Sequence, residues 1–574
     1  MSDGEPTASA RSDLRRWRRA AVANRFESDA FFERLLRRHL ADRFDDWVPR
    51  LRQVAEDSGA RFGVWVAESN HEENLPVLRR HDADGRPTEE VVFHPSYHAV
   101  GRVFWASGVL SVLATPGCEV ASGAIAYLLD QHGEAGHACP VACTAGAIKL
   151  LQKVGTNDQR ERYLPSLLQT DYDQRLHAAQ FVTEVQGGSD VGSNACLAFP
   201  EPGQPGWYRI SGEKWFCSVA DAGLFVVSAR PADAPGGTGG LGLFLVPRVI
   251  DGRPNGFSLR RLKTKLGTRS MATGEVEFDG ALGEAIGPLE HGFRNLVGIV
   301  LDTSRAHNAV AACGLMRRAY VEALRFAENR RAFERPIVDF PAVREILARM
   351  RVRTACALLT TFRILALTDR LAVGEAEDDL VATRRIAVMI NKYWTSVAST
   401  LTVREAIEIL GGNGTIEEFS VLPRLYRDAI VIESWEGTHN TLCAQVLRDF
   451  AVRRLHVPWL RQAKAEIDEL THAALAEQAA RARELHADVA ARIARVLASE
   501  PEQAAAHIRH VVDRMCRLTD FTVLVSQAQW DLDHGQDEAM IDVLEWYRRS
   551  AIDVVDPLDG GEWDALHLRV SVSA

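Results

Sequence analysis

A long stretch in the middle of this chain has a different periodicity from the sequence on either side of it. Between residues 178 and 280, short runs of alternating apolar and polar residues are separated by glycine-rich turns. Such runs predict β-strands, whereas the apolar residues before and after this stretch recur at helical spacing. The sequence therefore predicts a mainly α-helical protein with an inserted β domain. Strands are expected at 207–211, 224–228, 243–247, 257–262 and 274–279.

The changes of periodicity also divide the chain. At 574 residues it is too long for one hydrophobic core. Residues 60–92 contain turn signals around 82–87 and are expected to be irregular. Long helices are expected near 291–330, 341–371, 376–410 and 436–454, and three or more further helices near 458–498, 502–530 and 536–552. We expect an N-terminal helical extension (1–60), an N-terminal α domain (61–178), a central β domain (179–288), a C-terminal helical bundle (289–452) and an additional helical tail domain (453–574).

Composition excludes several classes of protein. The chain is 46% hydrophobic and 25% charged, which is typical of globular proteins. Its net charge of −10 gives no general argument for nucleic acid or an anionic membrane as partner. The nine cysteines are scattered without a CxxC pair, so neither a disulfide framework nor a metal site is predicted. With no secretory signal and no apolar run of membrane-spanning length, a cytoplasmic protein is expected.

One carboxylate stands out near residue 436. Glu436 lies between Trp435 and Gly437, shortly after the apolar run 429–432. A glutamate against apolar and aromatic surface is desolvated, and desolvation raises its pKa toward the range of a general base. Taken alone, Glu-Gly is more often a solvated residue before a turn.

Two segments of the expected β domain suit a flat cofactor. In residues 181–194, Gly187 and Gly188 allow backbone N–H groups to approach a ligand closely, and Thr183 and Ser189 supply hydroxyl groups. Residues 210–218 follow with aromatic side chains that are able to cover a planar ring. The loop is neither a GxGxxG fingerprint nor a P-loop. Each segment alone is also compatible with a hairpin turn and core aromatics.

Taken together, these segments resemble the acyl-CoA dehydrogenase family of flavoproteins. The resemblance covers roughly residues 90–450. It implies that family's fold: an N-terminal helical domain, a central β-barrel or sandwich and a C-terminal four-helix bundle, here with an extra helical domain. The matching motifs, in order, are Thr183-Glu-Val-Gln-Gly-Gly-Ser-Asp190, the hairpin 210–218, Arg330-Arg-Ala-Phe333, Gly411-Gly-Asn-Gly414, Arg424-Leu-Tyr-Arg-Asp428 and Glu436-Gly-Thr438.

Within the family, the chain looks most similar to the AidB-like branch. That branch is linked to DNA binding and protection from alkylation, and its members form tetramers. The N-terminal extension and the long helical tail also fit it. The segments that carry this likeness are Phe93–His98, Glu134–Pro140, Gln186–Asp190, Lys265–Ser270 and Ser434–Gly437.

The resemblance implies FAD as cofactor and assigns roles to individual residues. Glu436 matches the base that removes the α-proton of an acyl thioester while flavin N5 accepts the β-hydride. Arg330, Phe333 and Gly412 match contacts that involve the FAD of a neighbouring subunit, so a homo-oligomer, a tetramer or dimer of dimers, is implied. The acyl pocket is matched by Ser304, Arg305 and Trp435, the last at a position where many relatives have Tyr. The other cofactor contacts are matched by Thr183, Ser189, Phe216, Ser218, Thr438 and Asn440.

Three functions remain open at this point. The first is α,β-dehydrogenation of an acyl-CoA or related thioester, with electron-transfer flavoprotein or O₂ as electron acceptor. The second is an AidB-like, DNA-associated flavoprotein with weak dehydrogenase activity. Residues 451–574 carry 14 Lys and Arg against 21 Asp and Glu, which disfavours the tail as a DNA surface. The third is a flavin oxidase or monooxygenase on the same fold.

Overall fold

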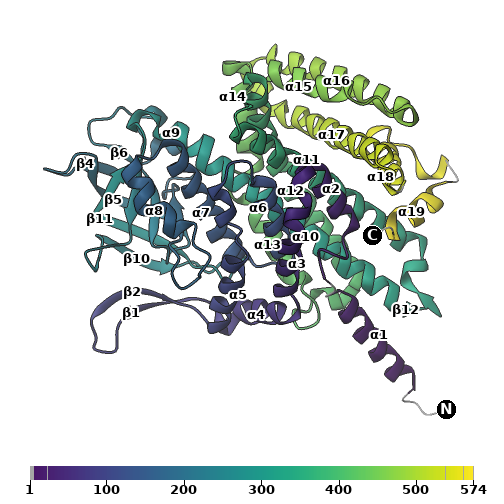
Figure 1. The fold of residues 1–574 in the computed structure, drawn as a ribbon, viewed down its shortest axis with the longest axis horizontal. Helices are drawn as coiled ribbons and strands as arrows, with labels where there is room; N and C mark the ends of the chain where they lie inside the picture. Colours follow the sequence, from purple (N-terminus) through teal and green to yellow (C-terminus); the bar gives the residue numbers. More distant parts are fainter. Residues whose placement is uncertain (1–4, 22–23, 376, 537, 560–561, 573–574) are drawn as a thin grey trace. The chain divides into compact units, whose positions relative to one another are not determined.

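The computed structural model describes residues 5–21, 24–375, 377–536, 538–559 and 562–572. The chain, shown as a ribbon in Figure 1, folds into two compact units. Unit 1 combines residues 1–60, 119–133 and 308–574, and unit 2 combines residues 61–118 and 134–307. Within the described ranges, no helix has both the length and the apolar content that crossing a bilayer requires.

Unit 2 contains the predicted β domain. Its sheet runs in the order β10-β11-β5-β4-β6-β3, and β7 pairs with both β6 and β11. The pairing of β7 closes five of the strands into a ring, which is the arrangement of a small barrel. The strands are β3 (Ala178–Phe181), β4 (Leu197–Pro200), β5 (Trp207–Ser218), β6 (Leu224–Pro231), β7 (Gly242–Pro247), β10 (Phe257–Leu262) and β11 (Thr273–Ala285).

Helices complete this unit. α8 starts with a capping box in which Thr156 and Gln159 satisfy each other's backbone N–H groups. α7 packs against the sheet through β3, where the Thr144 hydroxyl accepts a hydrogen bond from the Ala178 amide. The helices are α4 (Ala60–Asn70), α5 (Pro95–Ala106), α7 (Ala135–Val154), α8 (Asn157–Leu167), α9 (Gly292–Asn295) and the first turns of α10 (Asp302–Asn329).

The expectation that residues 60–92 are irregular is wrong. They form α4 and a hairpin of β1 (Val77–His81) and β2 (Pro87–Val92). The predicted turn is present, since Asp82 accepts backbone hydrogen bonds from Asp84 and Arg86. The flanking strand β1 is largely exposed, so it lacks the apolar alternation that identifies a half-buried strand.

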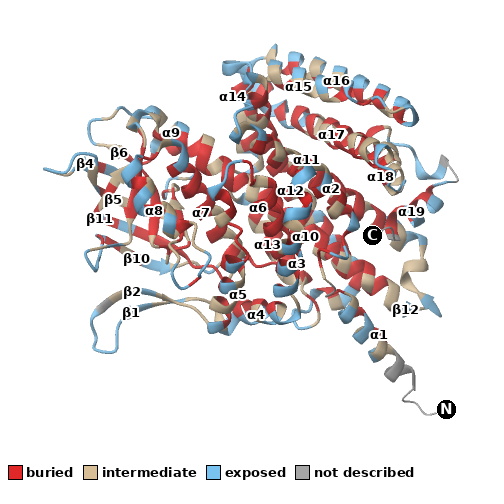
Figure 2. Cartoon of the chain, in the orientation of Figure 1, coloured by how far each residue is buried: buried red, intermediate tan, exposed pale blue. Residues whose placement is uncertain are grey.

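Among its described residues, unit 1 is helical apart from one short hairpin, β12 (Arg331–Ala332) with β13 (Arg335–Pro336). Its long bundle helices match the predicted ranges closely. Figure 2 shows that the buried residues concentrate along the helices in the middle of this unit. The helices are α1 (Glu5–Ala21), α2 (Ala30–Leu40), α3 (Phe44–Asp57), α6 (Glu119–Asp130), α10 from residue 308 onward, α11 (Pro341–Ala372), α12 (Asp378–Leu410), α13 (Leu422–Ser434) and α14 (His439–Arg453).

The tail belongs to unit 1, and its described residues form five helices, in line with the expectation of three or more. The range 458–498, which the periodicity predicts as one helix, is divided into α15 and α16. Between them, the backbone amides of Thr471 and His472 donate hydrogen bonds to the side chain of Gln529 of α17, at 2.7 and 3.0 Å. These bonds stabilise the non-helical backbone between the two helices. The tail helices are α15 (His456–Asp468), α16 (Ala476–Leu497), α17 (Pro501–Asp533), α18 (Ala539–Tyr547) and α19 (Trp563–Val572).

Candidate functional site

In unit 1, Glu436 lies in the tight turn between α13 and α14. Its φ of +56° is left-handed, a conformation that few non-glycine residues adopt. Gly437 follows with φ +106°, and α14 begins at His439. The Glu436 side chain is half-buried. Left-handed backbone at a residue other than glycine persists only where surrounding contacts hold it, and such residues concentrate at functional sites.

A buried lysine supplies those contacts. Lys392 of α12 is 0% exposed, and its Nζ donates to the carbonyl oxygens of Glu433 at 2.8 Å and Gly437 at 3.1 Å. These carbonyls lie on either side of Glu436 in the sequence. A cation is also favourable at the C-terminus of α13, where unpaired carbonyls carry partial negative charge. Lys392 therefore fixes both sides of the turn to a neighbouring helix.

The carboxylate of Glu433 also stabilises this turn. It accepts hydrogen bonds from the Thr400 hydroxyl and from Nε2 of His439 at 2.8 Å. Burial opposes ionisation of Glu433, but the bonds from His439 and Thr400 outweigh it, and the pKa of Glu433 is lowered. His439 is the first residue of α14, so this pair joins the end of one helix to the start of the next.

The other predicted residues of this turn differ in exposure. Trp435 is half-buried and packs against the unit's hydrophobic core. Thr438 and Asn440 are exposed at the start of α14. The hydroxyls of Thr438 and Thr441 are 3.0 Å apart. The exposed Thr438 and Asn440 leave this helix start accessible to a ligand.

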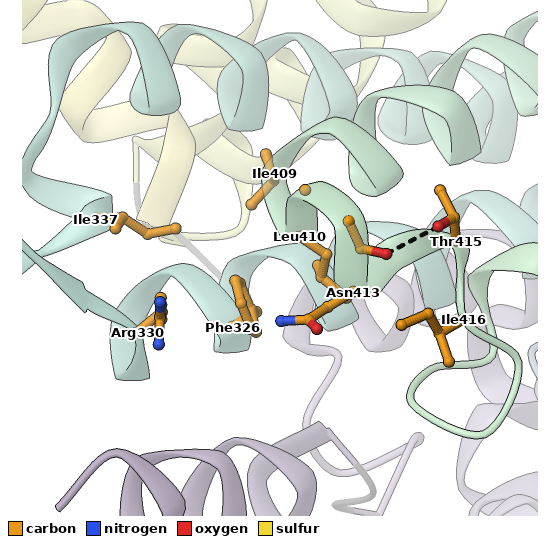
Figure 3. Close-up of a pocket in the computed structure, with 10 residues that line it drawn as sticks. Phe326, Arg330, Ile337, Ile409, Leu410, Asn413, Thr415 and Ile416 are labelled. Carbon is orange, nitrogen blue, oxygen red and sulfur yellow. Dashed lines mark hydrogen bonds between the residues drawn. The ribbon is translucent and has the colours of Figure 1, made fainter. Parts of the chain in front are cut away.

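Arg330 and Gly412, which lie far apart in the sequence, meet in one cavity of about 560 Å³ in unit 1. Figure 3 shows Phe326 of α10 between Arg330 and the 411–416 segment that follows α12. No atom lies within 4 Å of a β-carbon built on Gly412, so this side of the cavity is open. The Thr415 hydroxyl donates to the Gly412 carbonyl at 2.8 Å and closes the segment into a turn.

Phe333 does not line this cavity. It lies at the tip of the β12–β13 hairpin with φ +49° and is 89% exposed. Its one ring neighbour among the described residues is Phe340, with centroids 6.2 Å apart. Within the described residues, the Phe333 ring therefore buries little of its apolar surface.

In unit 2, the loop that carries Thr183 and Ser189 is tied down by a buried ion pair. Glu184 accepts from Lys214 Nζ at 2.7 Å and from the Ala195 amide at 2.6 Å. Burial alone would raise the pKa of Glu184, but Lys214 and the other donors lower it. A β-carbon built on Gly188 would lie 2.6 Å from the Thr183 hydroxyl, so a larger residue there would displace the Thr183 side chain.

Phe216 and Ser218 lie near the end of β5. Phe216 is 55% exposed, and the Ser218 hydroxyl is 3.3 Å from that of Thr273. The Lys263 ammonium lies 5.0 Å from the Phe216 ring centroid and 3.5 Å from that of Trp215. The strand therefore presents an exposed aromatic ring with a cation and a hydroxyl beside it.

Ser304 and Arg305, expected to line the acyl pocket, are buried within unit 2. Ser304 is 4% exposed and accepts a hydrogen bond from Gln180 of β3 at 2.7 Å. Arg305 is 1% exposed and pairs with Asp302 at 3.4 Å. The structure thus gives both residues partners inside their own unit.

Sequence reasoning missed Lys392, Glu433 and the Glu184–Lys214 pair. Glu184 belongs to the Thr183–Asp190 motif. It anchors the loop by pairing with Lys214, thirty positions away, and the motif does not include that partner. Lys392 follows the apolar run 386–390. A lysine beside such a run is expected to be buried, and a buried lysine needs hydrogen-bond acceptors, so this pattern could have identified Lys392 as an anchor.

Three sequence profiles match consecutive parts of the chain. Residues 18–174 match the N-terminal domain of the adaptive response protein AidB, residues 179–281 the middle domain of acyl-CoA dehydrogenases, and residues 290–451 their C-terminal domain. The putative acyl-CoA dehydrogenase AidB of Escherichia coli (strain K12) is 37% identical over 388 residues, which are 65% of this chain and 69% of that protein.

Solved structures agree with these matches. Caenorhabditis elegans ACDH-11, solved in complex with C11-CoA, has a TM-score of 0.84 at 25% identity and covers 94% of this chain and 93% of its own. A Bacillus anthracis acyl-CoA dehydrogenase solved with FAD shares the fold, with a TM-score of 0.67 at 20% identity over 83% of this chain and 86% of its own. The extent and order of these matches show that the chain belongs to the acyl-CoA dehydrogenase family and has an AidB-type N-terminal domain.

Proposed function

We propose that the protein is an FAD-dependent acyl-CoA dehydrogenase in which Glu436 removes the α-proton of an acyl thioester. The observation that carries this proposal is the turn at Glu436. Its left-handed backbone is fixed on both sides by hydrogen bonds from Lys392 to the carbonyls of Glu433 and Gly437. A base must be held in place to reach a proton on a bound substrate, and this turn meets that requirement.

The donor groups and open spaces of each unit fit a flavin nucleotide. Gly188 lets the 183–189 loop fold tightly against the Thr183 hydroxyl, and Phe216 offers an exposed ring for stacking. The cavity at Arg330 and Gly412 provides a guanidinium beside an open glycine turn, a combination suited to phosphate. That the Bacillus anthracis relative is solved with FAD is in line with this assignment.

The chemistry divides between cofactor and chain. FAD, when bound, supplies an acceptor at N5 for the hydride from the β-carbon. The chain supplies the base: Glu436 takes the α-proton, and the two electrons of that C–H bond become part of the new α,β double bond. Half-burial of Glu436 in a turn with Trp435 limits access of water to the carboxylate. The complex of ACDH-11 with C11-CoA supports an acyl-CoA as substrate class.

An oligomer is part of the proposal. Phe333 is 89% exposed and Arg330 is exposed at the end of α10, so both side chains are accessible to a second molecule. We assign Arg330, Phe333 and Gly412 to the FAD of a neighbouring subunit, as the family motifs imply. Dilution of the protein below the dissociation constant of the oligomer is then expected to release flavin.

The test is an anaerobic titration of the purified holoprotein with short, branched and long acyl-CoA thioesters, followed by flavin absorbance. A substrate bleaches the oxidised flavin, and Glu436→Gln slows bleaching by at least about a hundredfold, because loss of a general base costs that much. Glu484→Gln, an exposed glutamate on α16, serves as matched control and leaves the rate unchanged. Failure of every thioester to bleach the flavin, or bleaching by Glu436→Gln at the rate of the unmodified protein, would refute the proposal.

The same preparation separates the other two functions. Rapid reoxidation of substrate-reduced protein by air identifies an oxidase or monooxygenase. Salt-dependent retention of duplex DNA identifies the DNA-associated function. Against the latter, tail arginines are already paired with carboxylates: Arg548 with Glu545 and Asp553, and Arg549 with Glu545 and Glu562.

A further inference from the structure

A second and much smaller cavity, of about 30 Å³, lies within unit 1. All three chain segments of the unit contribute to its lining. Ala20 and Ala21 lie at the end of α1, Arg25 and Ser28 precede α2, and Gln131 directly follows α6. The remaining lining residues belong to α10 (Figure 1). None of the residues assigned to FAD or to the acyl thioester lines this cavity.

The size of the cavity restricts what it can hold. A water molecule or a monatomic ion needs about 10–15 Å³ of such space, so there is room for one or two particles of that size. Sites for organic molecules typically measure about 300 Å³ or more. The cavity is therefore suited to water or to a small inorganic ion.

The charges of the lining disfavour a cation. Four lining residues are arginines, and no described residue of the lining is acidic. The arginines are Arg25 and, from α10, Arg317, Arg318 and Arg325. Four guanidinium groups around one small space create a positive potential there, which favours an anion over a neutral water molecule.

Three of the four arginines have carboxylate partners, all of them outside the lining. Asp130 precedes Gln131 in the sequence, but burial raises its pKa to about 8, so at pH 7 it is mostly protonated and adds little negative charge. The three pairs therefore leave one positive charge unbalanced. They are Arg317–Asp29 at 3.1 Å, Arg318–Glu322 at 2.8 Å and Arg325–Glu328 at 2.9 Å.

The arginine without an ion pair is Arg25. It is 6% exposed, and none of the described carboxylates forms an ion pair with it. Its Nη1 donates to the carbonyl oxygen of Ser58, at the C-terminus of α3, over 3.1 Å. A helix C-terminus carries only about half a negative charge, so this contact does not balance the guanidinium. Val22 and Ala23, next to Ala21 in the sequence, carry no charged group. A buried charge without a counter-charge is costly.

Two titratable groups respond to the positive potential. The pKa of Arg25 is lowered to about 9, first by burial and then by the charge of Arg318, and the opposing effect of Glu322 does not make up for this. The pKa of His132 is lowered by burial and by the charges of Arg25, Arg318 and Arg424. An anion beside Arg25 offsets this repulsion.

We propose that this cavity binds one small monovalent anion, a halide such as chloride. The ion accepts a hydrogen bond from Arg25 and supplies the counter-charge that this guanidinium lacks. Because the three segments of unit 1 all line the cavity, the ion also links the N-terminal helices and the segment that ends at residue 133 to α10.

The direct test is diffraction from crystals of the full-length holoprotein with bromide as the probe, because bromide replaces chloride and scatters anomalously. We expect one bromide peak per chain in this cavity, within hydrogen-bond distance of the Arg25 guanidinium. The peak is lost in Arg25→Met and retained in Arg25→Lys, which keeps the charge. An empty or water-filled cavity in bromide overturns the proposal, and so does a peak that is unchanged in Arg25→Met.

The solution test compares urea unfolding in sodium chloride and in sodium gluconate at equal ionic strength, since gluconate is too large for the cavity. At a chloride concentration ten times its dissociation constant, the unfolding equilibrium constant falls about tenfold relative to gluconate, and the effect saturates. General salt effects on the protein surface do not saturate in this way. Arg25→Met abolishes the saturable response.

Arg52→Met is the matched control, because Arg52 is an exposed arginine of α3 that pairs with Glu27. It keeps the full chloride response. Equal unfolding in the two salts, or a full chloride response in Arg25→Met, overturns the proposal. Should Arg25→Met fail to fold, the bromide peak of the unmodified protein decides the question. Neither measurement involves a thioester, so the result is independent of the proposed dehydrogenase.

Discussion

Lys392 donates a hydrogen bond to the carbonyl oxygen of Gly437 over 3.1 Å, across 45 positions of sequence. The same ammonium group donates to Glu433 at 2.8 Å. Since Glu436 lies between these two acceptors, the backbone conformation of the proposed base is set by a side chain of α12. The geometry of the turn therefore depends on the packing of α12 against α13 as much as on the turn residues.

Replacement of Lys392 by Met tests this dependence. The variant leaves two carbonyls without their donor, so we expect the free energy of unfolding to fall by about 1–3 kcal/mol. Flavin reduction by a thioester slows as well, because Glu436 is no longer held in place. Urea unfolding and single-turnover bleaching measure the two effects, with the exposed Lys464→Met as control. Normal bleaching in a destabilised variant would show that the lysine only stabilises the fold.

The left-handed backbone of Glu436 is expected to lower the free energy of unfolding. A left-handed backbone at a non-glycine residue costs about 1 kcal/mol or more. Glu436→Gly removes this cost and Glu436→Ala does not, so the glycine variant should be the more stable of the two by about 1 kcal/mol. Both lose thioester-dependent bleaching. Equal denaturation midpoints for the two variants would mean that the turn carries no strain.

Gly411 and Gly412 are adjacent but should respond differently to substitution. Gly411 has φ +63°, so Gly411→Ala strains the backbone and lowers stability by about 1 kcal/mol. Gly412 has open space around it, and Gly412→Leu fills the cavity with little effect on the fold. We expect Gly412→Leu to lower the ratio of bound flavin to protein. A full flavin complement in this variant would separate the cavity from FAD binding.

Asp130 predicts a pH dependence of stability. Burial of this carboxyl group raises its pKa to about 8. In the unfolded chain it titrates near pH 3.9. Its stabilising contribution is complete below that pH and is lost as pH rises through about 8.

The check is a comparison with Asp130→Asn, which does not titrate. Between pH 5 and 8, the unmodified protein should lose up to about 1.4 kcal/mol per pH unit relative to this variant. Chemical denaturation at four pH values measures the difference. Parallel stability curves would show that Asp130 is already ionised in the folded state.

Periodicity predicts the fold well where apolar spacing and end signals agree. The expected helix 341–371 is α11, Pro341–Ala372, and its start carries proline at the first position, where helices favour it. Prediction fails where tertiary contacts decide. The break before α16 has neither glycine nor proline, and it exists because Gln529 accepts the amides of Thr471 and His472.

The predicted site residues stay predictions, although the structure brings some of them together. Arg330 and Gly412 share one cavity, which neither their separate motifs nor their spacing in the sequence predicted. Ser304 and Arg305 are buried in their own unit, an outcome that depends on Gln180 and Asp302. Lys392 belongs to no family motif used for the prediction, because its role is visible only once α12 and the turn are placed side by side.

The division of unit 1 into three separate chain segments has a consequence for synthesis on the ribosome. Residues 1–60 are made before the rest of their unit, whose other segments begin with residues 119–133 and continue only from residue 308. At about 5–20 residues per second, the first helices wait tens of seconds for the bundle. During that time Trp17 and Phe32, at 2% and 0% exposure in the finished fold, have no native core to enter. Unit 2, complete by residue 307, is free to fold first, while these apolar side chains of the N-terminal helices stay exposed until the bundle is made.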